Sequence, residues 1–141
     1  MFKLAQYHLS IMSFRLEKNF HLKVVGDIEN DWLPPGIIHT LVENGVSHNK
    51  YRIEDIEFVL ERYINDQDVV FSLSVPQGKK RRNTSSEIGT GTGSKYISAQ
   101  LEQAFSRHYK ITNKETDSYW TTKISISLKQ YKKTLESVEL R

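Results

Sequence analysis

Apolar side chains recur along this chain with two different spacings. Three segments place them three and four positions apart, which predicts helices at residues 3–17, at 34–48 and around 99–105. Other segments alternate apolar and polar side chains, which predicts strands with one buried face. These strands are expected at residues 20–25, 56–64, 69–75 and 119–128, with a further one starting at residue 109. The pattern therefore mixes helices with strands.

Turn residues divide these segments. Residues 65–68 read as a hairpin turn, and Pro76 ends the second strand of that hairpin, because proline has no N–H to donate to a ladder. Residues 77–86 are polar and basic, which predicts a mobile, solvent-facing loop. Residues 113–117 are expected to form a turn, and the charged residues after Lys129 a loosely held tail.

The second predicted helix has two different faces. Pro34 and Pro35 fit a helix start, and Trp32 is expected to pack at its entrance. An apolar stripe consists of Ile37, Ile38, Leu41, Val42 and Val46. A second face carries Thr40, Asn44, Ser47 and His48. The pattern leaves two interpretations open: a surface helix whose polar side meets water, or a wall that presents polar groups to a ligand.

A glycine-rich segment precedes the third predicted helix. Gly89, Gly91 and Gly93 occupy alternate positions, so backbone N–H groups there could approach an anion, and a helix N-terminus adds partial positive charge. The segment is not a P-loop, because Gly93 is followed by Ser94 and only then by Lys95. A flexible linker is the alternative interpretation.

Two motifs together resemble the sensor histidine kinases, specifically their LytS-like branch with the GHKL, or Bergerat, ATPase fold. Leu33-Pro34-Pro35 followed by Leu41-Val42-Glu43-Asn44 is similar to their asparagine box, and the Gly-Thr-Gly-x-Gly of residues 89–93 to their second glycine box. The resemblance covers residues 14–129. It implies an α/β fold, a two-layer α+β sandwich whose mixed, largely antiparallel sheet has helices packed on one face.

The resemblance also implies roles for individual residues. Asn44 would be the Mg²⁺ ligand, with Glu43 as the neighbouring acid of the catalytic pair. Thr40, Ser47 and His48 would line the nucleotide, and Ser47 stands where the family has a lysine. The nucleotide's phosphates would lie against Gly89, Thr90, Gly91, Thr92 and Gly93. A lid is expected at Lys79, Lys80, Arg81 and Arg82.

Two departures from the family define the alternatives for function. The family's Asp-x-Gly-x-Gly, whose aspartate accepts a hydrogen bond from adenine, is replaced here by residues 74–78, which hold no acid. ATP binding is therefore expected to be weak or lost. We also expect the phosphoacceptor histidine to lie outside these residues. The chain would then be an ATP-binding catalytic domain that supplies Mg-ATP for histidine phosphorylation, or a non-catalytic pseudokinase module of the same fold.

The resemblance implies a place in a larger protein. Residues 1–17 would be the end of a dimerisation and linker region, 18–129 the ATP-binding domain, and 130–141 a charged tail. Partners would be the parent's own dimerisation and phosphoacceptor region and a response regulator, with the parent a homodimer. The domain would be cytoplasmic and its parent would lie in the inner membrane.

Composition and charge exclude only a few kinds of site and partner. The 141 residues suit one domain, and the absence of cysteine excludes disulfides and thiolate metal sites. The net charge is +3, with four basic residues at positions 79–82, which fits an anionic ligand. No nucleic-acid partner is expected, because the sequence shows neither a helix-turn-helix pattern nor strands that interleave basic and aromatic residues.

Overall fold

The computed structural model describes residues 3–28, 31–34, 36–80 and 92–139. Its main sheet has five strands in the order β1-β3-β4-β7-β6, and a small second sheet pairs β2 with β5. The strands are β1 (Asn19–Val25), β2 (Asn49–Lys50), β3 (Asp55–Asn65), β4 (Asp68–Pro76), β5 (Lys79–Lys80), β6 (Tyr109–Glu115) and β7 (Tyr119–Ser127). The helices are α1 (Lys3–Leu16), α2 (Ile37–His48), α3 (Thr92–Phe105) and α4 (Leu128–Glu139).

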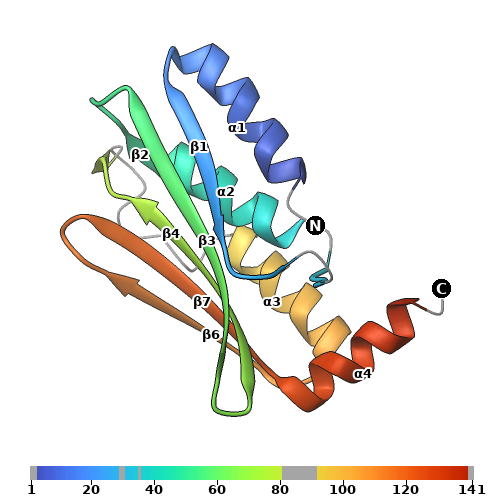
Figure 1. Cartoon of the computed structure of the whole chain (residues 1–141). Helices are drawn as coiled ribbons and strands as arrows, with labels where there is room; N and C mark the ends of the chain where they lie inside the picture. Colours follow the sequence, from blue (N-terminus) through green and yellow to red (C-terminus); the bar gives the residue numbers. More distant parts are fainter. Residues whose placement is uncertain (1–2, 29–30, 35, 81–91, 140–141) are drawn as a thin grey trace.

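The main sheet is mixed, as the resemblance implied. β1 runs parallel to β3, and the other neighbouring strands of the sheet are antiparallel. The parallel pair requires a crossover, which the chain makes through α2. Helices α1, α2 and α3 lie over the same face of the sheet (Figure 1). The predicted two-layer α/β architecture is therefore confirmed.

The core lies between this face and the helices. Alternate residues of β3 and β4 point into it, and the periodic apolar residues of α2 and α3 cover them. The buried side chains include Phe58, Leu60, Phe71, Leu73, Val42, Val46, Leu101 and Phe105. Burial of such side chains contributes roughly 1.5–3 kcal/mol each, which fixes the helices on the sheet.

Helix α1 presents apolar side chains on two sides. Ala5 and Leu9 are buried, whereas the four periodic apolar residues that predicted the helix remain exposed. Leu4, Tyr7, Ile11 and Phe14 are 57%, 64%, 58% and 88% exposed. The spacing thus predicted the helix correctly, but these four residues do not belong to the core.

Residues 130–139 do not form a loose tail, so that prediction is wrong for this part of the chain. They belong to α4, and Tyr131 is only 1% exposed. The Tyr131 hydroxyl accepts a hydrogen bond from the N–H of Trp32 at 2.8 Å and donates one to the Trp32 carbonyl at 2.9 Å. Burial raises the pKa of this hydroxyl. The Trp32 ring contacts Phe105 of α3, and its predicted packing at the entrance of α2 stays a prediction.

The predicted turn at 113–117 is displaced. β6 continues to Glu115, and residues 116–118 connect it to β7. Asn113 lies opposite Thr122 in the ladder, and its side-chain oxygen accepts a hydrogen bond from the Thr122 hydroxyl at 2.8 Å. The ladder therefore extends through residues that are usually found in turns.

None of the helices described above is both long and apolar enough to cross a bilayer.

Candidate functional site

Helix α2 lies unusually close to the sheet at one point. It begins at Ile37, after Gly36 in a left-handed conformation (φ 89°), so the two prolines precede the helix. A Cβ atom added at Gly45 would lie 2.9 Å from Cγ1 of Val75 and 3.1 Å from the ring of Phe58. The absence of a side chain at Gly45 thus sets the distance between α2 and β4.

The predicted polar face of α2 is present. Thr40 and Asn44 are half-buried and lie one helical turn apart. Ser47 is exposed and His48 is half-buried, and the Nδ1 atom of His48 is buried without a hydrogen-bond partner among the described residues. The helix therefore brings together the four α2 residues that the resemblance assigned to the nucleotide.

The side chain of Glu43 lies on a different side of α2 from the side chain of Asn44. Adjacent residues of an α-helix are separated by about 100° around its axis. The Glu43 carboxylate lies 3.4 Å from Nε2 of His39, one turn earlier, and the His39 ring contacts His8 of α1. Glu43 thus faces the side of α2 that carries α1, and its predicted catalytic role stays a prediction.

The chain that leaves β4 is held against the C-terminal end of α2. Lys79 and Lys80 pair with Lys50 and Asn49, so the prediction of a mobile loop is wrong for this part of residues 77–86. The Asn49 side chain donates to the carbonyl of Gly45 at 2.9 Å and accepts from the N–H of Gly78 at 3.1 Å. Sequence reasoning missed Asn49, because both of its partners are backbone groups.

The segment that replaces the family's acidic motif uses its polar groups within the protein. The Ser74 and Thr121 hydroxyls are hydrogen-bonded at 3.0 Å. The Tyr51 hydroxyl donates to the Pro76 carbonyl at 2.6 Å, and burial raises its pKa. The Gln77 amide donates to the Thr116 carbonyl in the β6–β7 turn. No acidic side chain stands in this stretch.

Helix α3 lies beside α2 and begins within the glycine segment, at Thr92. A Cβ atom added at Gly36 would lie 2.7 Å from the hydroxyl of Tyr96, so the start of α3 reaches the start of α2. Thr92 and Gly93 form the first turn of α3. Other predicted site residues lie outside the described residues: Arg81, Arg82, Gly89, Thr90 and Gly91.

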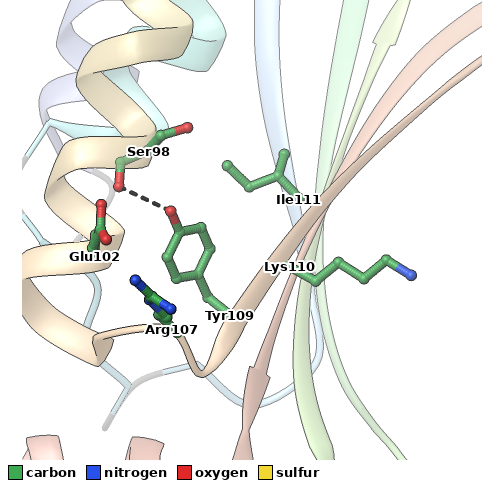
Figure 2. Close-up of a pocket in the computed structure, with 6 residues that line it drawn as sticks. All are labelled: Ser98, Glu102, Arg107, Tyr109, Lys110 and Ile111. Carbon is green, nitrogen blue, oxygen red and sulfur yellow. Dashed lines mark hydrogen bonds between the residues drawn. The ribbon is translucent and has the colours of Figure 1, made fainter.

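A shallow depression of about 320 Å³ lies between α3 and β6, and none of the predicted site residues lines it (Figure 2). It is lined by Ser98, Glu102, Arg107, Tyr109, Lys110 and Ile111. The Tyr109 hydroxyl donates to the Ser98 carbonyl at 3.3 Å. The side chain of Lys110 points away from α3, so Arg107 and Glu102 are the charged groups beside the ring of Tyr109. No sequence motif pointed to this depression.

Asn49 offers a first mutational test of this geometry. Asn49→Ala is expected to lower the free energy of unfolding by about 1–3 kcal/mol, because it leaves two backbone groups without their partner. Amide exchange at Gly78 should become faster, which NMR can follow. Asn19→Ala, at an exposed position, serves as the control. Unchanged exchange at Gly78 would show that Asn49 does not hold this segment.

Comparison with protein-family models and with curated protein sequences finds no match. Solved structures do match. The histidine kinase domain of the blue-light activated histidine kinase of Erythrobacter litoralis EL346 aligns over 94% of this chain and 68% of its own, with TM-score 0.59 and 14% identity. Acinetobacter baumannii histidine kinase AdeS aligns over 89% and 64%, with TM-score 0.58 and 12% identity.

The catalytic domain of histidine kinase ThkA aligns over 89% of this chain and 90% of its own, with TM-score 0.53 and 12% identity. This chain thus spans about two thirds of the first two matched chains and most of this isolated domain. At these identities the likeness establishes architecture. The chain has the fold of the histidine kinase domains that it matches.

Proposed function

We propose that this chain is the ATP-binding catalytic domain of a two-component sensor histidine kinase, which supplies Mg-ATP for phosphorylation of a histidine outside these residues. The observation that carries the proposal is the match in fold to histidine kinase domains, among them an isolated catalytic domain. The asparagine box and the glycine box add residue-level support, because both occur in the expected order along the chain.

In this proposal the polar face of α2 forms one wall of the nucleotide site. Thr40, Ser47 and His48 would contact the nucleotide, and Glu43 would be the acidic neighbour of Asn44. The phosphates would lie at the glycine segment, residues 89–93, at the N-terminus of α3. A helix start favours such anions because its first N–H groups have no partners within the helix. The lid role of Lys79, Lys80, Arg81 and Arg82 stays a prediction.

The residues present fit a magnesium ion bound together with phosphates. Within the described part of the chain, no three acidic or histidine side chains gather to hold a metal. Mg²⁺ commonly takes one or two protein oxygens and completes its shell with phosphates and water. Asn44 could supply such an oxygen, because its side chain makes no hydrogen bond to the described residues. When bound, the ion would neutralise phosphate charge.

One observation favours the alternative of a non-catalytic module with weak or no ATP binding. Residues 74–78 stand where the family has its adenine-binding acid, and their polar groups already make hydrogen bonds within the protein. The Pro76 carbonyl accepts from the Tyr51 hydroxyl, and the Gln77 amide donates to the β6–β7 turn. A nucleotide base would find no acidic acceptor there. An unpaired hydrogen-bonding group costs about 1–3 kcal/mol, which would weaken binding at this end of the site.

Calorimetric titration with Mg-ATP tests the proposal. We expect Mg²⁺-dependent binding with a dissociation constant above the low micromolar range. Asn44→Ala should abolish the dependence on Mg²⁺, whereas Gln6→Ala, at an exposed position on α1, should bind as the wild type does. A thermal-shift series gives a second readout, since a ligand at a hundred times its dissociation constant stabilises a protein by about 2.7 kcal/mol.

Each outcome separates the alternatives. No binding at millimolar Mg-ATP would contradict the catalytic proposal and leave the non-catalytic module. Low-micromolar binding would contradict the argument from the missing acid. Unchanged Mg²⁺ dependence in Asn44→Ala would remove Asn44 from the metal site.

The partners follow from the same proposal. The parent protein would contribute the dimerisation and phosphoacceptor region, form a homodimer and pass the phosphoryl group to a response regulator. The domain would lie in the cytoplasm, with its parent in the inner membrane. These assignments rest on the kinase proposal, and phosphotransfer from the full-length parent tests them.

A further inference from the structure

Two histidines meet where α1 rests on α2. The rings of His8 on α1 and His39 on α2 contact edge to face, with centroids 5.2 Å apart and planes at 85°. Ala5 and Leu9 of α1 are buried close to this pair along the helix. The imidazole pair therefore lies at the interface between the two helices, where both residues are half-buried.

The pair contains nitrogen atoms that are buried without partners. Nε2 of His8 and Nδ1 of His39 are inaccessible to water and make no hydrogen bond to any residue that the structure describes. The remaining His39 nitrogen, Nε2, lies 3.4 Å from the Glu43 carboxylate. An added proton on His39 would have this carboxylate beside it, whereas a proton on Nε2 of His8 would have no acceptor.

The surroundings of His8 disfavour its protonated form on balance. Burial lowers the pKa of His8, the positive charge of His39 lowers it further, and Glu43 opposes them with a smaller effect. Helix α1 also packs on β1, but the charged groups that act on His8 within the described residues are His39 and Glu43, both on α2. A protonated His8 is thus disfavoured while α1 is docked.

We propose that the contact between α1 and α2 is a pH-sensitive joint, docked while His8 is neutral and loosened when His8 takes up a proton. The direction of the pH dependence follows from the linkage between docking and proton binding. The docked state binds fewer protons than the undocked state, so docking is fully favoured above the ordinary histidine value of 6.5. It weakens as the pH falls below that value.

The contact between α1 and α2 is susceptible to protonation of His8 because one side of α1 is largely exposed. Leu4, Tyr7, Ile11 and Phe14 are more than half exposed, whereas the buried residues Ala5 and Leu9 lie on the other side of the helix. Because α2 also carries Asn44 and Glu43, a loosened α1 would uncover the side of α2 where Glu43 lies. The inference itself does not depend on nucleotide binding.

Amide hydrogen exchange at pH 7.5 and pH 5.5, corrected for intrinsic rates, tests the proposal. Protection of α1 amides should fall as the pH falls, by up to about tenfold per unit between 6.5 and the pKa of docked His8. Protection of the α3 amides should change much less and serves as the internal reference. NMR titration of the His8 ring proton should give a pKa below 6.5.

Variants make the assignment specific to His8. His8→Phe keeps an aromatic ring and should remove the pH dependence of α1 protection. His21→Gln is the matched control, because His21 is exposed on β1 beside Asp55, and it should retain that dependence. If His8→Phe does not fold, His39→Gln should raise the pKa of His8 towards 6.5 and reduce the pH dependence.

Two results would overturn the proposal. The first is a His8 ring that titrates at or above 6.5 in the folded protein. The second is a loss of protection at low pH that is equal in α1 and α3, since acid would then loosen the whole domain.

Discussion

Tyr131→Ala is expected to lower the free energy of unfolding by about 3–5 kcal/mol, the cost of truncating a fully buried aromatic side chain. The ring of Tyr131 lies between those of Phe71 and Phe105, with centroids 5.9 Å from each, so its loss leaves a cavity where α3, α4 and β4 meet. The change also removes the hydroxyl that satisfies both backbone groups of Trp32. Urea denaturation followed by circular dichroism measures the loss.

Two further variants separate the contributions at this position. Tyr131→Phe keeps the ring and should cost about 1–3 kcal/mol through the unpaired backbone groups alone. Lys133→Ala, at an exposed position on the same helix, should change little. If Tyr131→Ala were as stable as Lys133→Ala, α4 would not be docked in solution.

Gly45→Val should have the second large effect, on the order of 3 kcal/mol of destabilisation. The first added carbon would already lie 2.9 Å from Val75 and 3.1 Å from Phe58, and both of these side chains are buried. Valine adds two more methyl groups, so α2 must move away from β4 or the core must rearrange. Helix propensity acts in the opposite direction, but by only a few tenths of a kcal/mol.

The control for this variant lies on the same helix. Ser47→Val introduces the same side chain at an exposed position, so any difference between the two variants reports the contact with the sheet. We expect Ser47→Val to unfold close to the wild-type urea midpoint and Gly45→Val well below it. Equal midpoints would mean that α2 does not approach β4 as closely as described.

Local patterns predicted the parts of the fold whose residues contact near neighbours. The three-four spacing in α2 identified its core stripe, and Val42 and Val46 are buried as that spacing requires. Alternation along β3 and β4 predicted the hairpin, and Asp66 at its turn adopts a positive φ of 55°. In both cases the deciding interactions lie within a few residues along the chain or across one ladder.

The C-terminal helix was missed although its local pattern was present. Leu128, Tyr131 and Leu135 follow the three-four spacing of a helix, but the lysines between them made the segment read as a charged tail. What docks it is the aromatic cluster around Phe105 and the backbone at Trp32. Neither partner can be recognised from the sequence of α4.

In the candidate site, as in the fold, some contacts form within one helix and others between segments that are distant in the sequence. Helical periodicity placed Thr40 and Asn44 on one face, because i and i+4 residues are neighbours on any helix. The same rule makes His39 and Glu43 neighbours, but it could not show that His8 of α1 would lie against His39, or that Asn49 would join Gly45 to Gly78. Those roles arise from how α1 and β5 come to lie against α2.

The bond between Tyr131 and Trp32 joins residues that are 99 positions apart. During synthesis on the ribosome, the chain emerges from its N-terminus at about 5–20 residues per second. The segment around Trp32 must therefore wait several seconds or more before its backbone groups find their partner. We expect nascent chains that stop before residue 131 to keep this segment open to proteases and chaperones, even after α2 and the β3–β4 hairpin have formed.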